Sequence, residues 1–233
     1  MAVAIVTGAS KGLGRALASA LARRGWDLVL DARNGDVLKE SAREAGAHGT
    51  RVVALPGDVT DPWHRSALVA AARELGGCDL LVNNASALGA EPLVRLDALP
   101  LEGLRAALET NVVAALGLVR EALPLLRASG AGTVVAVSSD AAAEAYPTWG
   151  GYGASKAALD QLAAVLGVEE PELRVYAVDP GDLATDLYRA AVPDDPGPRP
   201  APESVVPGFL ELLDRRPASG RYTAPLLVPG VGA

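Results

Sequence analysis

Cysteine and histidine are scarce in this sequence. The single cysteine, Cys78, excludes a disulfide within the chain and any metal site built from a cysteine cluster. The two histidines, His48 and His64, match no metal-ligand spacing and fall in stretches predicted to lie at the surface. We therefore predict no metal site. The low cysteine content is typical of a reducing compartment, and we expect a cytoplasmic protein.

Long apolar runs and an excess of positive charge are also missing. Nowhere do 18 apolar residues follow one another, and no basic segment of the kind that opens a secretory signal precedes the first apolar run. The formal net charge is −7, with a pI of about 4.9, whereas proteins that bind nucleic-acid backbones need a basic surface. We expect a protein that binds neither membranes nor nucleic acids.

Lysine is rare, and its placement is informative. Only three of the 21 basic residues are lysines, and Lys156 follows Tyr152 by four residues, a spacing that puts both on one face of a helix. A free tyrosine titrates at about 10, and a nearby ammonium favours the phenolate and lowers this pKa. The pair therefore predicts a tyrosine that exchanges protons near neutral pH, although such a spacing also arises by chance on solvated helices.

The chain alternates short apolar runs with longer amphipathic ones. Hydrophobic residues make up 50% and charged residues 21% of the 233 residues, which suits one globular domain over 1–233. Strands are expected at 3–6, 28–30, 51–55, 80–82, 133–137 and 174–178, and helices at 11–24, 37–45, 62–75, 101–128, 152–168 and 203–215. This pattern predicts an α/β fold with a doubly wound parallel sheet of about seven strands and helices on both faces.

A glycine-rich segment joins the first expected strand to the first helix. Gly8 would allow a tight turn, Gly12 would let backbone amides approach a pyrophosphate, and Gly14 would let the helix pack closely on the strand. The spacing is G-x-x-x-G-x-G, which differs from the G-x-G-x-x-G of other dinucleotide-binding proteins. The segment predicts a phosphate-binding turn at the positive end of a helix.

Together, Thr7 to Gly14 and Tyr152 to Lys156 resemble the short-chain dehydrogenase/reductase family, in its compact single-domain branch with a Rossmann fold. The resemblance implies a catalytic tetrad of Asn111, Ser139, Tyr152 and Lys156. In it the tyrosine transfers the proton, the serine holds the substrate carbonyl, the lysine holds the nicotinamide ribose, and the asparagine holds a water that links the lysine to solvent. Ser138 competes with Ser139 but should point away, and Asn111 could instead be a satisfied buried amide.

The resemblance also implies the residues that bind the cofactor. They are Gly8, Ser10, Lys11, Gly12, Leu13, Gly14, Arg33, Asp58, Val59, Asn84, Ala85, Tyr152, Lys156, Pro180, Gly181, Leu183 and Thr185. Asn83 is expected to be structural, as such residues often satisfy turns. Ser86 stands where the family has glycine in N-N-A-G, and its extra atoms put the fit of the nicotinamide ribose in question.

Two residues compete for the choice between NAD(H) and NADP(H). An acid after the second strand binds the ribose 2′-hydroxyl of NAD, whereas an arginine accommodates the 2′-phosphate of NADP. Asp31 comes one residue before the family's acidic position, which holds Ala32, and a one-residue shift in a strand reverses the direction of a side chain. Arg33 and Lys11 match the family's basic pattern, so we favour NADP(H) and expect Asp31 to be a turn residue or to pair with one of these cations.

The substrate is not identified by any charge clamp. Residues 186–202 are expected to form a substrate lid, because the run 192–202 is too rich in proline for helix or strand. Trp149 and Tyr146 would either line the pocket or simply pack. We expect hydride transfer to or from a carbonyl or secondary alcohol, of neutral or apolar character, in a homodimer or homotetramer. The alternatives are a catalytically silent NADP(H)-binding sensor or scaffold and, less well matched, an epimerase or dehydratase of the extended branch.

Overall fold

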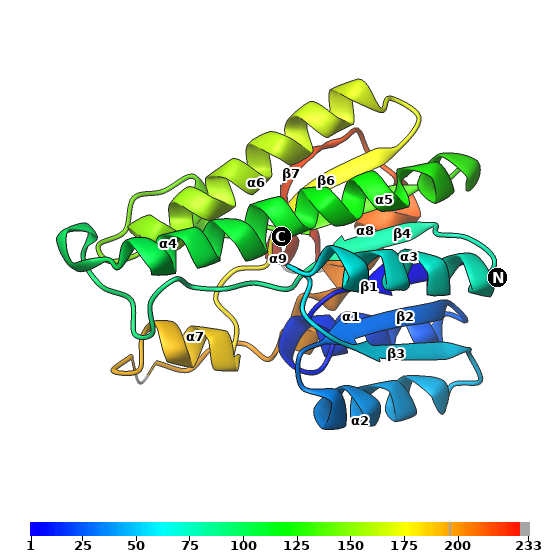
Figure 1. The fold of residues 1–233 in the computed structure, drawn as a ribbon, viewed down its shortest axis with the longest axis horizontal. Helices are drawn as coiled ribbons and strands as arrows, with labels where there is room; N and C mark the ends of the chain where they lie inside the picture. The colour runs from blue at the N-terminus through cyan, green and yellow to red at the C-terminus, as the bar shows by residue number, and fades with distance from the viewer. Residues whose placement is uncertain (196, 229–233) are drawn as a thin grey trace.

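A single parallel sheet of seven strands forms the centre of the computed structural model, which describes residues 1–195 and 197–228. The strand order is β3-β2-β1-β4-β5-β6-β7, and all neighbours are parallel (Figure 1). The strands are β1 (Val3–Val6), β2 (Asp27–Ala32), β3 (Val52–Pro56), β4 (Leu80–Asn83), β5 (Thr133–Val137), β6 (Arg174–Asp179) and β7 (Gly220–Thr223). The chain order reverses between β1 and β4, and at such a point parallel sheets open a crevice for a ligand.

Helices cover both faces of the sheet, as predicted. The helices α1 (Gly12–Arg23), α2 (Gly35–Gly46) and α8 (Val206–Arg215) pack on one face, and α3 (Pro62–Leu75), α5 (Ala115–Ala128) and α6 (Gly150–Glu169) pack on the other. Side chains alternate between the two layers: in β1, Ala4 and Val6 join the first core cluster, and Val3 and Ile5 join the second. This two-sided burial explains why the strands read as continuous apolar runs.

The expected helix over 101–128 is interrupted. It consists of α4 (Leu101–Leu108), a π-helical segment η2 (Glu109–Ala114) and α5, so the prediction of one regular α-helix was wrong in its middle. The wider turn contains Asn111, whose side-chain amide binds the backbone N–H and C=O of Ala87 at 2.8 and 2.9 Å. Single π turns inside α-helices occur frequently at functional sites.

The C-terminal third contains an element that we did not place from the sequence. Strand β7 pairs with β6 at the sheet edge, and its short polar sequence GRYT is only partly buried. The expected helix over 203–215 divides into a 3-10 turn η4 (Pro202–Ser204) and α8, and the first part of the expected lid forms the short helix α7 (Asp186–Ala191). The remaining elements are η1 (Leu96–Ala98), η3 (Asp140–Ala142) and α9 (Ala224–Leu227).

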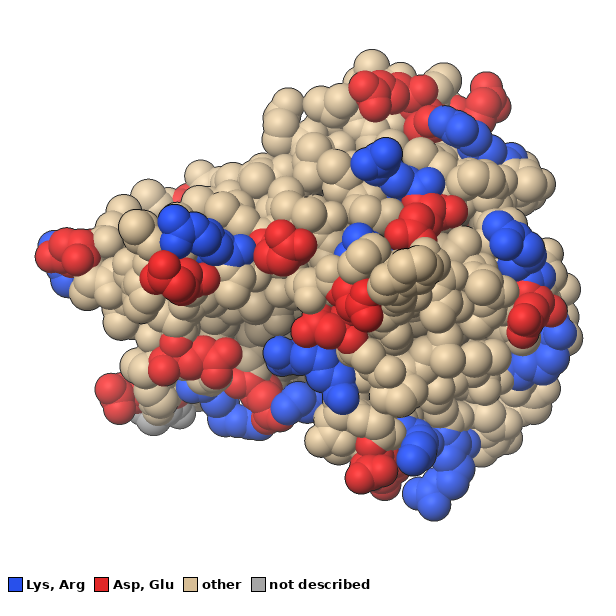
Figure 2. All heavy atoms as spheres, viewed as in Figure 1, with Lys and Arg blue, Asp and Glu red and all other residues tan. Residues whose placement is uncertain are grey.

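The surface carries both signs of charge. Acidic and basic side chains are interspersed over the face shown in Figure 2, so the negative net charge is not gathered in one patch there. Several form ion pairs along a helix, such as Lys39–Asp36 at 3.6 Å. Of the helices in 1–195 and 197–228, none combines the length and apolar character needed to cross a membrane.

Candidate active site

A cavity of about 910 Å³ runs along the carboxyl ends of the strands, on both sides of the reversal between β1 and β4. Its walls come from the glycine-rich turn after β1, the loops after β2 to β6, the start of α6 and the helix α7. Most residues predicted from the sequence to bind or react are found on this wall: Gly8, Ser10, Lys11, Gly12, Leu13, Arg33, Asp58, Val59, Asn84, Ala85, Ser139, Tyr152, Lys156, Pro180, Gly181, Leu183 and Thr185.

The turn after β1 leaves no room for side chains at two positions. Gly8 has φ of +62°, a left-handed conformation that favours glycine. A Cβ on Gly14 would lie 2.5 Å from the carbonyl oxygen of Gly8 and 2.6 Å from Asn84 Nδ2. The start of α1 therefore lies directly against the turn, and its free N–H groups face the cavity end where a phosphate would sit.

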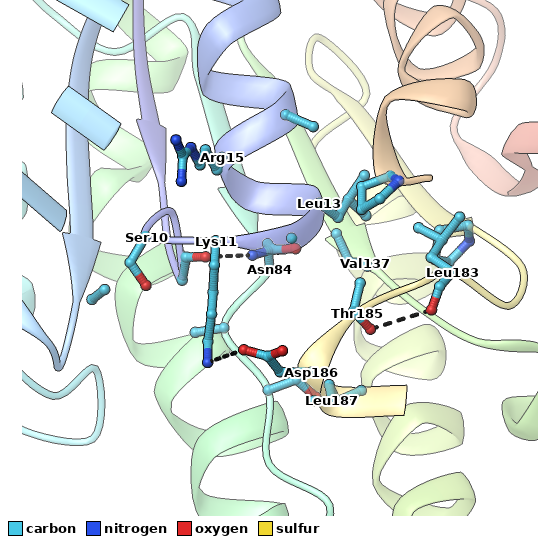
Figure 3. A pocket seen from close by; sticks show the side chains of 18 of the residues that line it. Ser10, Lys11, Leu13, Arg15, Asn84, Val137, Leu183, Thr185, Asp186 and Leu187 are labelled. Carbon is cyan, nitrogen blue, oxygen red and sulfur yellow. Dashed lines mark hydrogen bonds and ion pairs between the residues drawn. The ribbon is translucent and has the colours of Figure 1, made fainter. Parts of the chain in front are cut away.

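Thr7 and Asn84 hold this turn against the end of β4. The Asn84 amide donates to the carbonyls of Thr7 at 2.8 Å and Gly8 at 3.2 Å, and Thr7 Oγ1 accepts from the backbone N–H of Asn84 at 2.9 Å and of Ala85 at 3.0 Å. Figure 3 shows Asn84 directed at the turn. Asn84 thus has a structural role that we had assigned to Asn83, whose amide is also buried and lies 3.5 Å from the carbonyl of Ala115.

Replacing Gly14 with alanine tests this close packing. The added Cβ would lie 2.5 Å from the backbone oxygen of Gly8 and 2.6 Å from Asn84 Nδ2, which hydrogen bonds to Thr7 and Gly8 hold in place. We expect Gly14→Ala to lower the free energy of unfolding by about 2 kcal/mol and to weaken NADPH binding at least about tenfold. The matched control is Gly46→Ala at the end of α2, where the nearest atom lies 4.0 Å away. Equal melting temperatures and NADPH dissociation constants in the two variants would contradict the prediction.

Asp31 lies on the cavity wall, but its carboxylate is engaged by protein groups. Its side chain is buried, with Oδ1 accepting from the Gly8 N–H at 3.1 Å and Oδ2 lying 3.2 Å from His64 Nε2. Asp31 therefore orients the glycine-rich turn. Its charged-group partner is His64, whereas we expected Lys11 or Arg33. His64 in turn is mostly buried, with 10% of its side chain exposed, so its predicted surface position was wrong.

Basic side chains gather at the same end of the cavity. Arg33 is exposed on the cavity wall, and its charge contributes to a lowered pKa of Asp58, after the larger effect of the Thr60 backbone N–H. Lys11 also lines the cavity, but its ammonium pairs with Asp186 at the start of α7, as Figure 3 shows. Sequence reasoning missed Asp186, and only its place directly after Thr185 could have suggested it.

Tyr152 is buried beside the cavity. Trp149 packs edge-on against its ring, with centroids 5.7 Å apart, and Lys156 Nζ lies 5.5 Å from the ring centroid. Burial raises the pKa of Tyr152, a hydrogen-bonding contact with Ser86 opposes this, and the charges of Asp140 and Asp179 add to it. The expectation that Lys156 lowers the tyrosine pKa is therefore not met in this geometry.

Lys156 is directed at the backbone. Its Nζ donates to the carbonyl oxygen of Val137 at 2.7 Å, and the residue is only 1% exposed. Burial lowers the pKa of Lys156 to about 8, with Asp160 opposing the shift. An ammonium has three N–H donors, of which Val137 receives one, and Lys156 lines the cavity.

Both the oxygen and the nitrogen of the Asn111 side-chain amide form hydrogen bonds with protein groups. Besides Ala87, the amide oxygen accepts from Ser86 Oγ at 3.2 Å, and the amide nitrogen donates to Ser155 Oγ at 2.8 Å. Ser155 in turn donates to the carbonyl of Tyr152 at 2.7 Å. The amide thereby ties the π turn of η2 to the N-terminal part of α6. The serine within Y-G-A-S-K was the available signal for this link.

Ser139 stands on the cavity wall, with its hydroxyl engaged by neighbours. Its Oγ donates to Asp140 at 3.0 Å and accepts from the Ala141 N–H at 3.2 Å. A substrate oxygen would have to replace Asp140 as the acceptor. Ser138 is buried, and its hydroxyl lies 3.5 Å from the Ser139 carbonyl, yet it also contributes to the cavity wall.

The loop after β6 closes the far side of the cavity. Gly181 has φ of +69°, Leu183 is buried, and Thr185 caps α7 by accepting from the Tyr188 N–H at 3.2 Å. Tyr188 then faces Trp149 with centroids 6.4 Å apart, and both line the cavity. Tyr146, the other aromatic that we considered for the pocket, lies outside the cavity wall, with its hydroxyl bound to Glu144 at 2.8 Å.

Comparison with known proteins is consistent with this geometry. The chain matches the model of the short chain dehydrogenases over residues 2–196. It is 36% identical to sepiapterin reductase of Mus musculus over 202 residues, which cover 82% of this chain and 77% of that protein. It is 38% identical to glycine betaine reductase ATRR of Emericella nidulans over 188 residues, 79% of this chain, so it spans only 15% of that longer relative.

A solved structure gives the same result for the fold. A protein described as a short-chain dehydrogenase of Shigella flexneri 2a, in complex with NADP, superposes with a TM-score of 0.89 at 28% identity, and the match covers 96% of each chain. The sheet order, the glycine-rich turn after β1 and the Tyr152–Lys156 spacing are all present here. The chain belongs to the short-chain dehydrogenase family of oxidoreductases.

Proposed function

We propose that the protein is an NADP(H)-dependent oxidoreductase that interconverts a carbonyl compound and a secondary alcohol, with Tyr152 as the proton donor and acceptor. The observation that carries this proposal is the buried phenol of Tyr152 on the wall of the cavity that Ser139 also lines, with Lys156 Nζ 5.5 Å from its ring centroid. A nicotinamide dinucleotide supplies or accepts the hydride when bound. The protein's contribution is to bind, to orient and to move a proton.

The chain's own groups divide this work. Burial raises the pKa of Tyr152, so the phenol is protonated at neutral pH and can donate to a carbonyl oxygen. Burial lowers the pKa of Lys156 to about 8, so the protonated form is present at neutral pH and can replace the proton that Tyr152 gives up. The Ser139 hydroxyl would exchange Asp140 for the substrate oxygen as its acceptor. Trp149 and Tyr188 form the aromatic walls over the substrate.

The residues along the cavity support a dinucleotide with an extra phosphate as its ligand. The cavity runs from Arg33 and Lys11 to Tyr152, and the close approach at Gly14 brings the start of α1 against the turn. Arg33 and Lys11 would hold the 2′-phosphate. Asp31, the acid that could instead bind the ribose 2′-hydroxyl of NAD, already bonds to Gly8 and His64. The NADP complex of the Shigella relative supports the same preference.

The decisive experiment is oxidation of NADPH and of NADH over a small panel of ketones, aldehydes and quinones. We expect turnover with NADPH, at a kcat/KM at least about tenfold above that with NADH. NADPH binding without any turnover across the panel would instead favour the silent sensor or scaffold. A preference for NADH would overturn the assignment of Arg33.

We further propose that two copies of the chain associate through α5 and α6. These helices expose Leu116, Val165 and Val168, of which Val168 is 81% exposed, and they enclose a shallow apolar groove lined by Leu116, Leu162 and Leu166. Apolar patches of this kind mark association surfaces. Light scattering that gave the single-chain mass of 23.7 kDa at micromolar concentration would exclude the dimer or tetramer.

A further inference from the structure

Arg221, on the edge strand β7, reaches across the sheet end to three other elements. Its Nε donates to Asp160 Oδ2 in α6 at 3.0 Å, and its Nη2 donates to the carbonyl oxygen of Ser139, after β5, at 2.9 Å. The same Nη2 lies 3.6 Å from Asp179 Oδ2 at the end of β6. Arg221 does not itself line the cavity.

Each contact belongs to an element that carries the proposed chemistry. Ser139 is the serine expected to hold the substrate oxygen, and Asp160 lies one helical turn beyond Lys156. Asp179 accepts from the Gly181 N–H at 2.9 Å through its other oxygen, so it fixes the loop expected to hold the nicotinamide end of the cofactor. One guanidinium thus links three parts of the site, and its planar fork suits several simultaneous acceptors better than an ammonium would.

Arg221 also brings a positive charge to an acidic neighbourhood. Burial raises the pKa of Asp179, the charges of Asp140 and Asp160 add to the shift, and the Gly181 N–H and Arg221 oppose it. Asp140 and Asp179 in turn raise the pKa of Tyr152. The buried Asp160 Oδ1 has no hydrogen-bond partner among the described residues, so Arg221 is the group that compensates this carboxylate.

We infer that Arg221 is a positioning residue, which holds Ser139, α6 and the loop after β6 in the reactive arrangement and screens Tyr152 from the neighbouring carboxylates. The inference rests on the proposed function. The edge strand β7, with its short and only partly buried sequence, thereby takes part in the reaction. Arg221 acts through other residues and contacts neither substrate nor cofactor.

The test compares Arg221→Met with the wild-type protein in both reaction directions. We expect kcat to fall about tenfold because Ser139 loses its anchor, with KM for NADPH within about twofold. In alcohol oxidation, which needs the phenolate, the ascending limb of the pH–rate profile should move to higher pH by about half a unit or more, since Asp179, whose charge raises the pKa of Tyr152, loses its compensating cation. A second exchange, Asp179→Asn in the Arg221→Met background, should reverse the pH shift but not the loss of kcat.

Two further variants separate positioning from stability. Arg127→Met is the matched control, because Arg127 forms a two-pronged ion pair with Glu170 at the far end of α5, and Glu170 and Asp160 have equal side-chain exposure of 16%. We expect it to keep the wild-type kcat and pH profile. Arg221→Lys keeps the positive charge and replaces Arg221→Met in the test if that variant fails to fold. Its pH profile should stay near that of the wild type, while kcat falls several-fold because an ammonium lacks the planar fork.

A folded Arg221→Met or Arg221→Lys with wild-type kcat and pH profile would overturn the inference and leave the proposed function intact. The same loss in Arg127→Met would also overturn it. A wild-type protein without turnover would instead refute the proposed function.

Discussion

Tyr152→Phe should reduce turnover with the best carbonyl substrate by about a thousandfold, while NADPH binds with an affinity within about twofold of the wild type. The substitution removes only the hydroxyl that transfers the proton. The ring, which packs edge-on against Trp149 with centroids 5.7 Å apart, is kept, so the cavity wall should remain. Initial rates of NADPH oxidation and a fluorescence titration of NADPH measure the two quantities.

The matched control for this variant is Tyr146→Phe. Tyr146 precedes α6 by a few residues and lies outside the cavity wall, and its hydroxyl bonds to the exposed Glu144 at 2.8 Å. We expect wild-type turnover for it. Full activity in Tyr152→Phe would refute the assigned proton transfer, and equal losses in both variants would show that the loss does not come from the Tyr152 hydroxyl in particular.

The alternation of apolar and amphipathic segments was enough to predict the layers of this fold. Continuous apolar runs such as Val3 to Val6 and Thr133 to Val137 can only be buried on both faces, and both became strands over those bounds. Strand β7 lacks this signal, because an edge strand of four residues with Arg221 in it needs no apolar run. The π turn η2 was missed because its cause is tertiary: Asn111 binds Ala87, 24 residues earlier in the chain.

The sequence motifs were enough to predict which residues lie at the site. They did not predict the hydrogen bonds of these residues, which depend on tertiary packing. The glycines, Ser139, Tyr152 and Lys156 meet at one cavity because all follow the carboxyl ends of parallel strands or lie beside them. The partners that each side chain meets in the folded chain decide its hydrogen bonds. Lys156 binds the Val137 carbonyl, Ser139 binds Asp140, and Lys11 meets Asp186 across 175 residues.

Arg33→Ser should lower kcat/KM for NADPH by about thirtyfold, which corresponds to about 2 kcal/mol, the usual contribution of a hydrogen-bonded charge pair. Arg33 is exposed on the cavity wall beside Asp58, and its only assigned task is the 2′-phosphate. The loss should appear in KM with kcat nearly unchanged, because a phosphate far from the reacting carbon is bound equally in ground and transition states.

Lys11→Ser should have a smaller effect, of about threefold, because the Lys11 ammonium must first leave Asp186 before it can serve a phosphate. Arg43→Ser is the matched control, since Arg43 lies in α2 outside the cavity wall and pairs with Glu40 at 3.7 Å. It should leave kcat/KM unchanged with either cofactor.

The outcome with NADH distinguishes a lost phosphate contact from a damaged site. Asp31 is committed to the Gly8 N–H and to His64, so removing Arg33 exposes no carboxylate to the ribose, and kcat/KM for NADH should stay within about threefold of the wild type. Equal losses with both cofactors would show that Arg33 supports the turn itself. A gain with NADH of about tenfold or more would show that Asp31 can leave His64 and turn to the cavity, and the preference for NADP(H) would then rest on Arg33 holding that acid away.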